Sequence, residues 1–318
     1  MKAAFMSSAL ALLLVTVTGC SSSSAAGGET TAAASASQGV TVKDFAGRSV
    51  ALKGAPSKIV ALSNGELDIV YALGSEVVGR PASTSPVPVK AAEKAVQVGS
   101  THGIDLEKIA LLSPDVVLGN NPMNAKDIPS VESLGPKMVL SSANSIDDIK
   151  KQIQLIGQLL QKESKAAELI KGLDDKLQAL VPKEGASKPR VLLVYGAPGT
   201  YMAALNNSLS GDILVKAGGE NIAADYPKLE SYPQYAQLNT EKIVKSNPQL
   251  VLLMSHTNPD QVKEGFMKEM SQNAAWSSLD AVKNNRVEVL PADLFGTNPG
   301  TRVSESLDQL SRLLQTVK

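Results

Sequence analysis

EKIALLSPDVVL fills residues 107–118 and EKIVKSNPQLVL fills residues 241–252, so one pattern of residues occurs twice in the chain. In both copies a glutamate precedes a proline by seven residues, and the proline predicts the end of a helix just before a strand. The Val and Leu run after the proline is typical of a strand buried in a parallel sheet. The repeat therefore predicts two equivalent α/β units that face each other, with a ligand cleft between them.

Short apolar runs and longer helical patterns alternate along the chain, which indicates parallel sheets covered by helices. The predicted strands are 58–62, 115–118, 137–140, 190–195, 249–254 and 286–290. Between the third and fourth strands, Ile and Leu recur at helical spacing across 146–180, after a capping box at Ser145 and Asp148. This spacing predicts a long connecting helix, with Gly157 and Ser164 as the points where it would bend. The predicted fold class is α/β, with two Rossmann-like lobes joined by that helix.

The N-terminal residues resemble an export signal followed by a lipid attachment site. Residues 9–17 are apolar apart from Thr16, and this stretch is too short to span a bilayer. Cys20, the only cysteine in the sequence, follows Val-Thr-Gly as in a bacterial lipobox, so we expect it to carry lipid. The predicted organisation is a signal peptide at 1–19, a lipidated flexible tether at 20–39, an N-terminal lobe at 40–144, the connecting helix at 145–182 and a C-terminal lobe at 183–318.

Composition and motifs exclude several classes of function. Lys and Arg total 31 and Asp and Glu total 31, so no excess of positive charge predicts nucleic-acid binding. One Trp, six Tyr and four Phe are few for a base-stacking surface. No nucleophile elbow, Walker A loop, dinucleotide fingerprint or zinc-protease motif occurs, and the glycine-rich stretch 196–199 predicts only a tight turn. We therefore predict a binding protein and not an enzyme.

The two histidines of the chain fall one in each predicted lobe. His102 lies in a polar loop just before the first repeat, and His256 lies just after the strand of the second repeat. Ligands collect at the carboxyl ends of strands in open sheets, which favours both positions. Two imidazoles are too few for a typical zinc site but suffice for the two axial positions of a haem iron. The alternative is that both are ordinary exposed histidines.

Four further stretches carry a resemblance to a known family. They are RVLLVYGAPGTY at 190–201, Gly-Asp at 211–212, AGGEN at 217–221 and AVKNN at 281–285. With the order of tether, lobe, long helix and lobe, they resemble the class III substrate-binding proteins of ABC importers, which take up siderophores, cobalamin or haem. The chain is most similar to the haem-binding lipoproteins of Gram-positive bacteria.

This resemblance implies a function and a set of site residues. It implies an extracytoplasmic, monomeric receptor, lipid-anchored to the outer face of the cell membrane, which passes haem to an ABC permease dimer. His256 matches the second-lobe axial ligand of the family, and His102 matches a first-lobe ligand that is methionine in some members. Glu107 and Glu241 match the two exposed glutamates that dock with arginines of the permease subunits.

Other residues are weaker candidates for contact with haem. Arg80 and Arg302 could pair with its propionates, because a guanidinium matches carboxylate geometry. Alternative iron ligands are Tyr201, Met123, Met202 and Met254, and candidates for the apolar face of the porphyrin are Ile104 and Leu294. Three rival interpretations stay open: a ferric-siderophore or cobalamin receptor of the same fold, an extracytoplasmic enzyme, and a structural surface protein.

Overall fold

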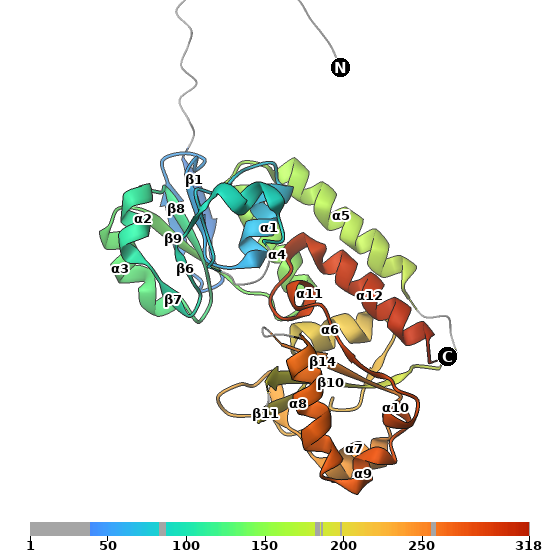
Figure 1. Ribbon diagram of the computed structural model, residues 1–318. Coiled ribbons are helices and arrows are strands. Elements are labelled where there is room, and N and C mark those ends of the chain that lie inside the picture. The colour runs from blue at the N-terminus through green and yellow to red at the C-terminus, as the bar shows by residue number, and fades with distance from the viewer. Residues whose placement is uncertain are drawn as a thin grey trace, which may run out of the picture. The chain divides into compact units, whose positions relative to one another are not determined.

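Two β-sheets, one from each half of the chain, organise the protein (Figure 1). The computed structural model describes residues 39–82, 87–181, 185, 187–197, 199–255 and 259–317. Residues 37–318 belong to one compact unit. The predicted signal peptide, Cys20, the tether up to residue 38, and His256 lie outside the described residues. Within the described part, no helix combines the length and the apolar character that a membrane crossing needs.

The N-terminal sheet has five parallel strands in the order β5-β4-β3-β8-β9. Its strands are β3 (Ile59–Ala61), β4 (Gly79–Arg80), β5 (Val96–Gln97), β8 (Val116–Asn120) and β9 (Lys137–Ser141). The surrounding elements are hairpin β1 (Val40–Lys43) with β2 (Ser49–Leu52), and helices α1 (Asn64–Ala72), α2 (Leu106–Leu112) and α3 (Ile128–Ser133). Val60, Val117 and Met138 face a core completed by Ile109 of α2 and Val131 of α3. This sheet confirms the predicted parallel α/β arrangement.

The C-terminal sheet is mixed, although the sequence predicts a parallel one. Strands β10 (Arg190–Ala197), β12 (Glu220–Asn221), β13 (Tyr235–Gln237), β14 (Leu250–Met254) and β15 (Val287–Val289) run in one direction, whereas β11 (Thr200–Ala204) runs antiparallel to its neighbours β10 and β13. The reversal occurs at the predicted glycine-rich turn, where Ala197 pairs with Thr200 and Gly199 has a φ of 83°. A Cβ at Gly196 would overlap the Thr200 carbonyl, so this hairpin requires glycine there.

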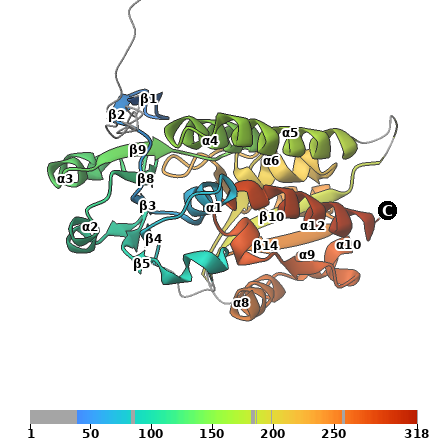
Figure 2. The ribbon, with the colours of Figure 1, turned by 90° about the horizontal axis from the view of Figure 1, so that it is seen from above.

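The connecting region forms two helices, so a single long helix is not what the chain adopts. They are α4 (Ile146–Leu159) and α5 (Glu163–Ala179), which follow each other in Figure 2. The break lies between the two predicted bend points, at Gln161, whose φ is 54°, and the Lys162 amide donates back to the Gly157 carbonyl at 2.7 Å. A Cβ at Gly157 would lie 2.5 Å from the Ala166 Cβ, so glycine allows the turn to close tightly.

One continuous apolar cluster joins the two sheets. It includes Ile59 and Leu118 of the first sheet, Ile153 of α4, and Val191 and Leu252 of the second sheet. The remaining helices are α6 (Leu209–Lys216), α7 (Thr240–Ser246), α8 (Pro259–Ser271), α9 (Ala274–Ser277), α10 (Asp280–Lys283), α11 (Ala292–Phe295) and α12 (Val303–Gln315). Because buried apolar area is the main favourable contribution to folding, this cluster ties both halves into one body.

Polar contacts also connect the C-terminal residues to α1. The Asp68 carboxylate accepts hydrogen bonds from the Thr301 amide and hydroxyl, both at 2.6 Å. Gln152 of α4 donates to Glu66 at 3.2 Å and accepts from Asn298 at 2.9 Å. Burial raises the pKa of both Glu66 and Asp68. The end of the chain therefore completes the packing of a helix near its beginning.

Candidate functional site

The repeated sequence forms two equivalent units of helix and strand. Helices α2 and α7 each span seven residues, and each is followed by a parallel strand, β8 or β14. Asp105 and Asn239 cap the two helices in the same way, each accepting a hydrogen bond from the amide three residues later. Ser113 and Asn247 end them in the left-handed conformation, with φ of 46° and 43°. The predicted order of helix, break and strand is confirmed in both halves.

These helices place Glu107 and Glu241 at equivalent points. Both glutamates lie in the first turn of their helix and are exposed. Each helix ends just before its strand begins, so its first turn lies toward the carboxyl end of that strand. That edge of a parallel sheet is where α/β proteins bind ligands.

His102 lies at the tip of a small hairpin on the same side of the first sheet. The hairpin pairs β6 (Gly99–Ser100) with β7 (Gly103–Ile104), and the exposed His102 lies in the turn between them. The His102 amide donates to Ser100 Oγ at 3.2 Å. The fully buried Asn124 donates to the Thr101 carbonyl at 3.4 Å, so it holds this turn. Sequence analysis missed Asn124, because nothing in the sequence indicates a contact with a loop so far upstream.

His256 cannot be placed against His102, because it lies outside the described residues. The strand before it, β14, ends at the buried Met254. Among the alternative ligands, Met123 is 39% exposed, Met202 is half-buried and Met254 is 1% exposed. Accessibility therefore favours Met123 among the three methionines.

The two candidate arginines differ in their surroundings. Arg80 ends β4 and is buried, its Nη1 donates to the Pro81 carbonyl at 3.2 Å, and its buried Nε has no hydrogen-bond partner. No carboxylate of the described residues pairs with Arg80. A buried cation without an anionic partner is costly, and an anionic group of a ligand would offset that cost.

Arg302 is already paired within the protein. Its Nη2 lies 2.7 Å from Asp293 Oδ2 and its Nε lies 3.1 Å from Glu305 Oε1. Burial would lower the pKa of Arg302, but the hydrogen bonds to Glu305 and Asp293 outweigh it and raise the pKa. A propionate would have to compete with two carboxylates for this guanidinium.

Tyr201 is likewise engaged in packing. Its hydroxyl donates to the Val262 carbonyl at 3.2 Å. Its ring packs edge-to-face against Phe266, with the two ring centroids 5.1 Å apart. Burial, and then the charge of Glu269, raise the pKa of Tyr201. A phenol with a raised pKa is less readily converted to the phenolate that binds iron.

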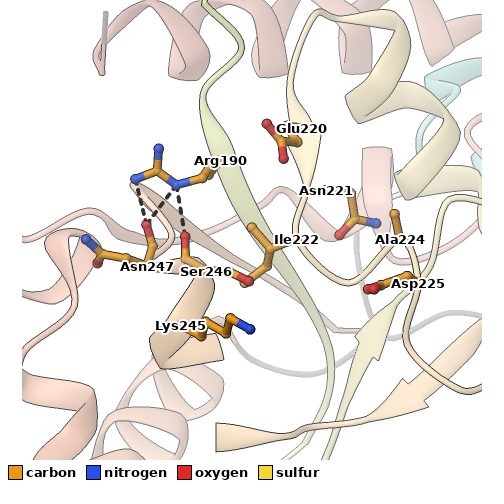
Figure 3. A pocket seen from close by; sticks show the side chains of 9 residues that line it. All are labelled: Arg190, Glu220, Asn221, Ile222, Ala224, Asp225, Lys245, Ser246 and Asn247. Atoms are coloured by element: carbon orange, nitrogen blue, oxygen red, sulfur yellow. Dashed lines mark hydrogen bonds between the residues drawn. The ribbon is translucent and has the colours of Figure 1, made fainter. Parts of the chain in front are cut away.

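Two hollows among the described residues lie beside the repeated helices. A hollow of about 540 Å³ adjoins the first turn of α2 and is lined by Ile104, Glu107 and the base of the His102 hairpin. The other, of about 600 Å³, lies at the end of α7 (Figure 3). There Arg190 donates to the Ser246 and Asn247 carbonyls, both at 2.9 Å. Arg190 begins β10, so this second hollow lies at the amino edge of its sheet, away from the ligand edge.

Comparison with known proteins agrees with this architecture. The sequence profile of the periplasmic binding protein family matches residues 59–294. The high-affinity heme uptake system protein IsdE of Staphylococcus aureus strain Newman is 30% identical over 236 residues, covering 74% of this chain and 79% of that protein. An ABC transporter substrate-binding protein from Listeria monocytogenes EGD-e has a TM-score of 0.70 and 31% identity, covering 82% of this chain and 99% of that chain. S. aureus IsdE complexed with heme has a TM-score of 0.69 and 28% identity, covering 81% of this chain and 98% of that chain.

Fold, site and comparisons together define a binding protein of the ABC importer type. The chain belongs to the periplasmic binding protein family. Members of this family capture a solute outside the cytoplasm for a transporter, so the prediction that the chain is no enzyme is confirmed by its family. The resemblance to class III substrate-binding proteins is confirmed as well.

Proposed function

We propose that this protein is an extracytoplasmic haem receptor of an ABC importer, in which His102 and His256 bind the two axial positions of the iron. The observation that carries the proposal is the position of His102, which is exposed at the tip of a hairpin on the ligand edge of its sheet. The heme-complexed IsdE structure, with a similar fold over most of the chain, supports haem as the ligand.

The described residues offer groups that suit haem. Neutral imidazole is a common axial ligand of haem iron, and His102 is accessible. The buried, unpaired Nε of Arg80 suits a propionate. Ile104, half-buried next to the His102 turn, supplies apolar surface for the porphyrin. When bound, haem supplies the iron for uptake, and this protein carries out no chemistry on it.

Delivery of haem to the permease would use α2 and α7, the helices that carry Glu107 and Glu241. Glu107 and Glu241 would each contact a basic residue on one subunit of a permease dimer, and one receptor molecule would present both glutamates. A diacylated Cys20 and the tether to residue 39 would keep the receptor at the outer face of the membrane. The lobes 40–144 and 183–318 would hold haem between them, on either side of the connecting helices at 145–182.

Haemin titration of the purified protein tests the ligand and its coordination together. We expect a six-coordinate low-spin absorption spectrum that His102→Ala and His256→Ala each convert to another form. Tyr201→Phe is the matched control and should leave the spectrum unchanged, because its hydroxyl is bound to Val262. If neither histidine variant alters the spectrum, histidine ligation is wrong, and titrations with ferric siderophores and cobalamin would then identify the ligand.

A further inference from the structure

The outer faces of α2 and α7 can be compared position by position, because the two helices have the same length, caps and buried isoleucine. Ile109 and Ile243 are both fully buried and fix the same rotation of each helix about its axis. With Glu107 and Glu241 in equivalent places, Leu111 in α2 corresponds to Lys245 in α7. The proposed docking faces therefore share an acid and differ one turn later.

Leu111 gives α2 an apolar docking face. It lies four residues after Glu107, so both side chains occupy one face of the helix. Leu111 is 85% exposed, more than any other large apolar residue in the described part of the chain. One exposed leucine is ordinary by itself, but here it stands where the corresponding position of α7 is a lysine, on the same face as the proposed docking residue Glu107. Lys108, the neighbouring cation, is already paired with Asp105 at 2.9 Å.

Lys245 gives α7 a charged docking face. It is exposed and lies four residues after Glu241, a spacing at which Glu and Lys commonly pair, yet it forms no ion pair with a described residue. Its side chain lines the hollow at the end of α7 (Figure 3). Lys242, the neighbouring cation, lies over the ring of Tyr226 at 4.9 Å from its centroid. The free charges of this face are therefore an acid in the first turn and a base in the last turn.

We infer that the receptor makes two chemically unequal contacts with the permease: α2 adds an apolar contact through Leu111 to the ionic contact of Glu107, whereas α7 makes an ionic contact through Glu241 and Lys245. This inference rests on the proposed docking role of the two glutamates. The partner surface facing α2 then carries a basic residue beside an apolar patch, and the surface facing α7 carries a basic residue beside an acidic one. Salt screens the ionic contact and leaves the apolar one largely intact.

Receptor-stimulated ATP hydrolysis tests this difference, using the permease and its ATPase subunits from the native host in proteoliposomes. The measurement is the receptor concentration that gives half-maximal stimulation, at low and at high salt. We expect Leu111→Ser to raise that concentration roughly tenfold at both salt concentrations, the effect of losing one buried leucine. Lys245→Gln should raise it about threefold at low salt and hardly at all at high salt. Leu134→Ser is the matched control, because Leu134 is an exposed leucine of the same half, outside α2.

Two outcomes would overturn the inference. One is a half-maximal receptor concentration for Leu111→Ser that equals that of the Leu134→Ser control. The other is an effect of Leu111→Ser on this concentration that depends on salt as strongly as the effect of Lys245→Gln. Glu107→Gln and Glu241→Gln test the proposed docking role separately, and haemin titration tests the ligand. If both glutamine variants weaken stimulation but Leu111→Ser does not, only the inference is wrong. Thermal unfolding of each variant checks that these exposed substitutions leave the fold intact.

Discussion

The two sheets share a central pattern and differ at their margins. In the first, β3 lies beside β8 and β8 beside β9, all parallel, and in the second β10, β14 and β15 repeat this order. Outside this shared part, the first sheet continues with two short parallel strands, whereas the second adds an antiparallel hairpin. Every shared strand except β3 follows a helix, and the shared strands lie in the buried core, which constrains their order, while the edge strands are free to diverge.

The largest effect expected from this comparison concerns the buried isoleucine of each repeat. Ile109→Ala and Ile243→Ala should each lower the free energy of unfolding by about 2–5 kcal/mol, because both leave a cavity in a closed core. Urea unfolding measures the loss. Clearly unequal losses would show that the two units are not packed equivalently.

Next in size is the difference between the two candidate arginines. Arg80→Met should weaken haem binding about tenfold, or roughly 1.4 kcal/mol, because a propionate of haem loses the guanidinium that would pair with it. Arg302→Met should leave affinity unchanged, since Asp293 and Glu305 already pair with Arg302. Absorption titration measures both. Haem dimethyl ester, which has no propionate charge, should bind Arg80→Met and the unaltered protein alike, and a persistent difference would contradict the assignment.

The free energy of unfolding should depend on pH through Glu66, a buried carboxyl in the first half of the chain. Burial raises the pKa of this carboxyl in the folded state, so the unfolded chain ionises first as the pH rises. The stabilising contribution is therefore complete below the ordinary pKa and is lost as the pH rises through the folded-state value. Glu66→Gln should flatten the fall in unfolding free energy that begins as the pH rises above 4.5, the ordinary value for this carboxyl, measured in urea. An unchanged slope would show that Glu66 does not titrate with unfolding, and Asp68, also with a raised pKa, would be substituted next.

The smallest expected effect concerns Lys58 and Arg190, which donate hydrogen bonds to backbone carbonyls at the C-terminal ends of α2 and α7. Arg190 makes hydrogen bonds at 2.9 Å to two carbonyls at the end of α7, whereas Lys58 reaches the Leu112 carbonyl of α2 only at 3.5 Å. Arg190→Met should cost about 1 kcal/mol of unfolding free energy and Lys58→Met less than about 0.5 kcal/mol. Thermal unfolding of both variants provides the comparison, and a greater loss for Lys58→Met would reverse the order.

Sequence predicted the features that depend on neighbours along the chain. The repeat, its prolines and the spacing of its apolar residues gave the helices, breaks and strands of both units. The break at Gln161 was not located, because a left-handed residue other than glycine has no clear sequence signal. The glycine-rich turn was predicted, but not the strand β11 after it, which pairs antiparallel with β10 across that turn and with β13 further along the chain.

The sequence also predicted only part of the candidate site, because the rest depends on contacts between distant parts of the chain. The exposed positions of His102, Glu107 and Glu241 agree with what polar loops and helix starts predict. The burial of Arg80 and the pairing of Arg302 depend on contacts made only in the folded chain, so a sequence cannot separate one arginine from the other. Asn124 is another such case, because its role depends on a backbone carbonyl in a distant turn.

The hydrogen bonds between Asp68 and Thr301 have a consequence for how this chain folds while it is synthesised. Helix α1 contains Asp68, but its partner is synthesised more than two hundred residues later, as the sequence separation of 233 shows. A chain that emerges from its amino end cannot complete the surroundings of α1 until Thr301 has been released. Folding of the first half should therefore finish late, so truncation shortly before Thr301 would leave the buried Asp68 carboxylate without the donors of Thr301 and give a product prone to proteolysis.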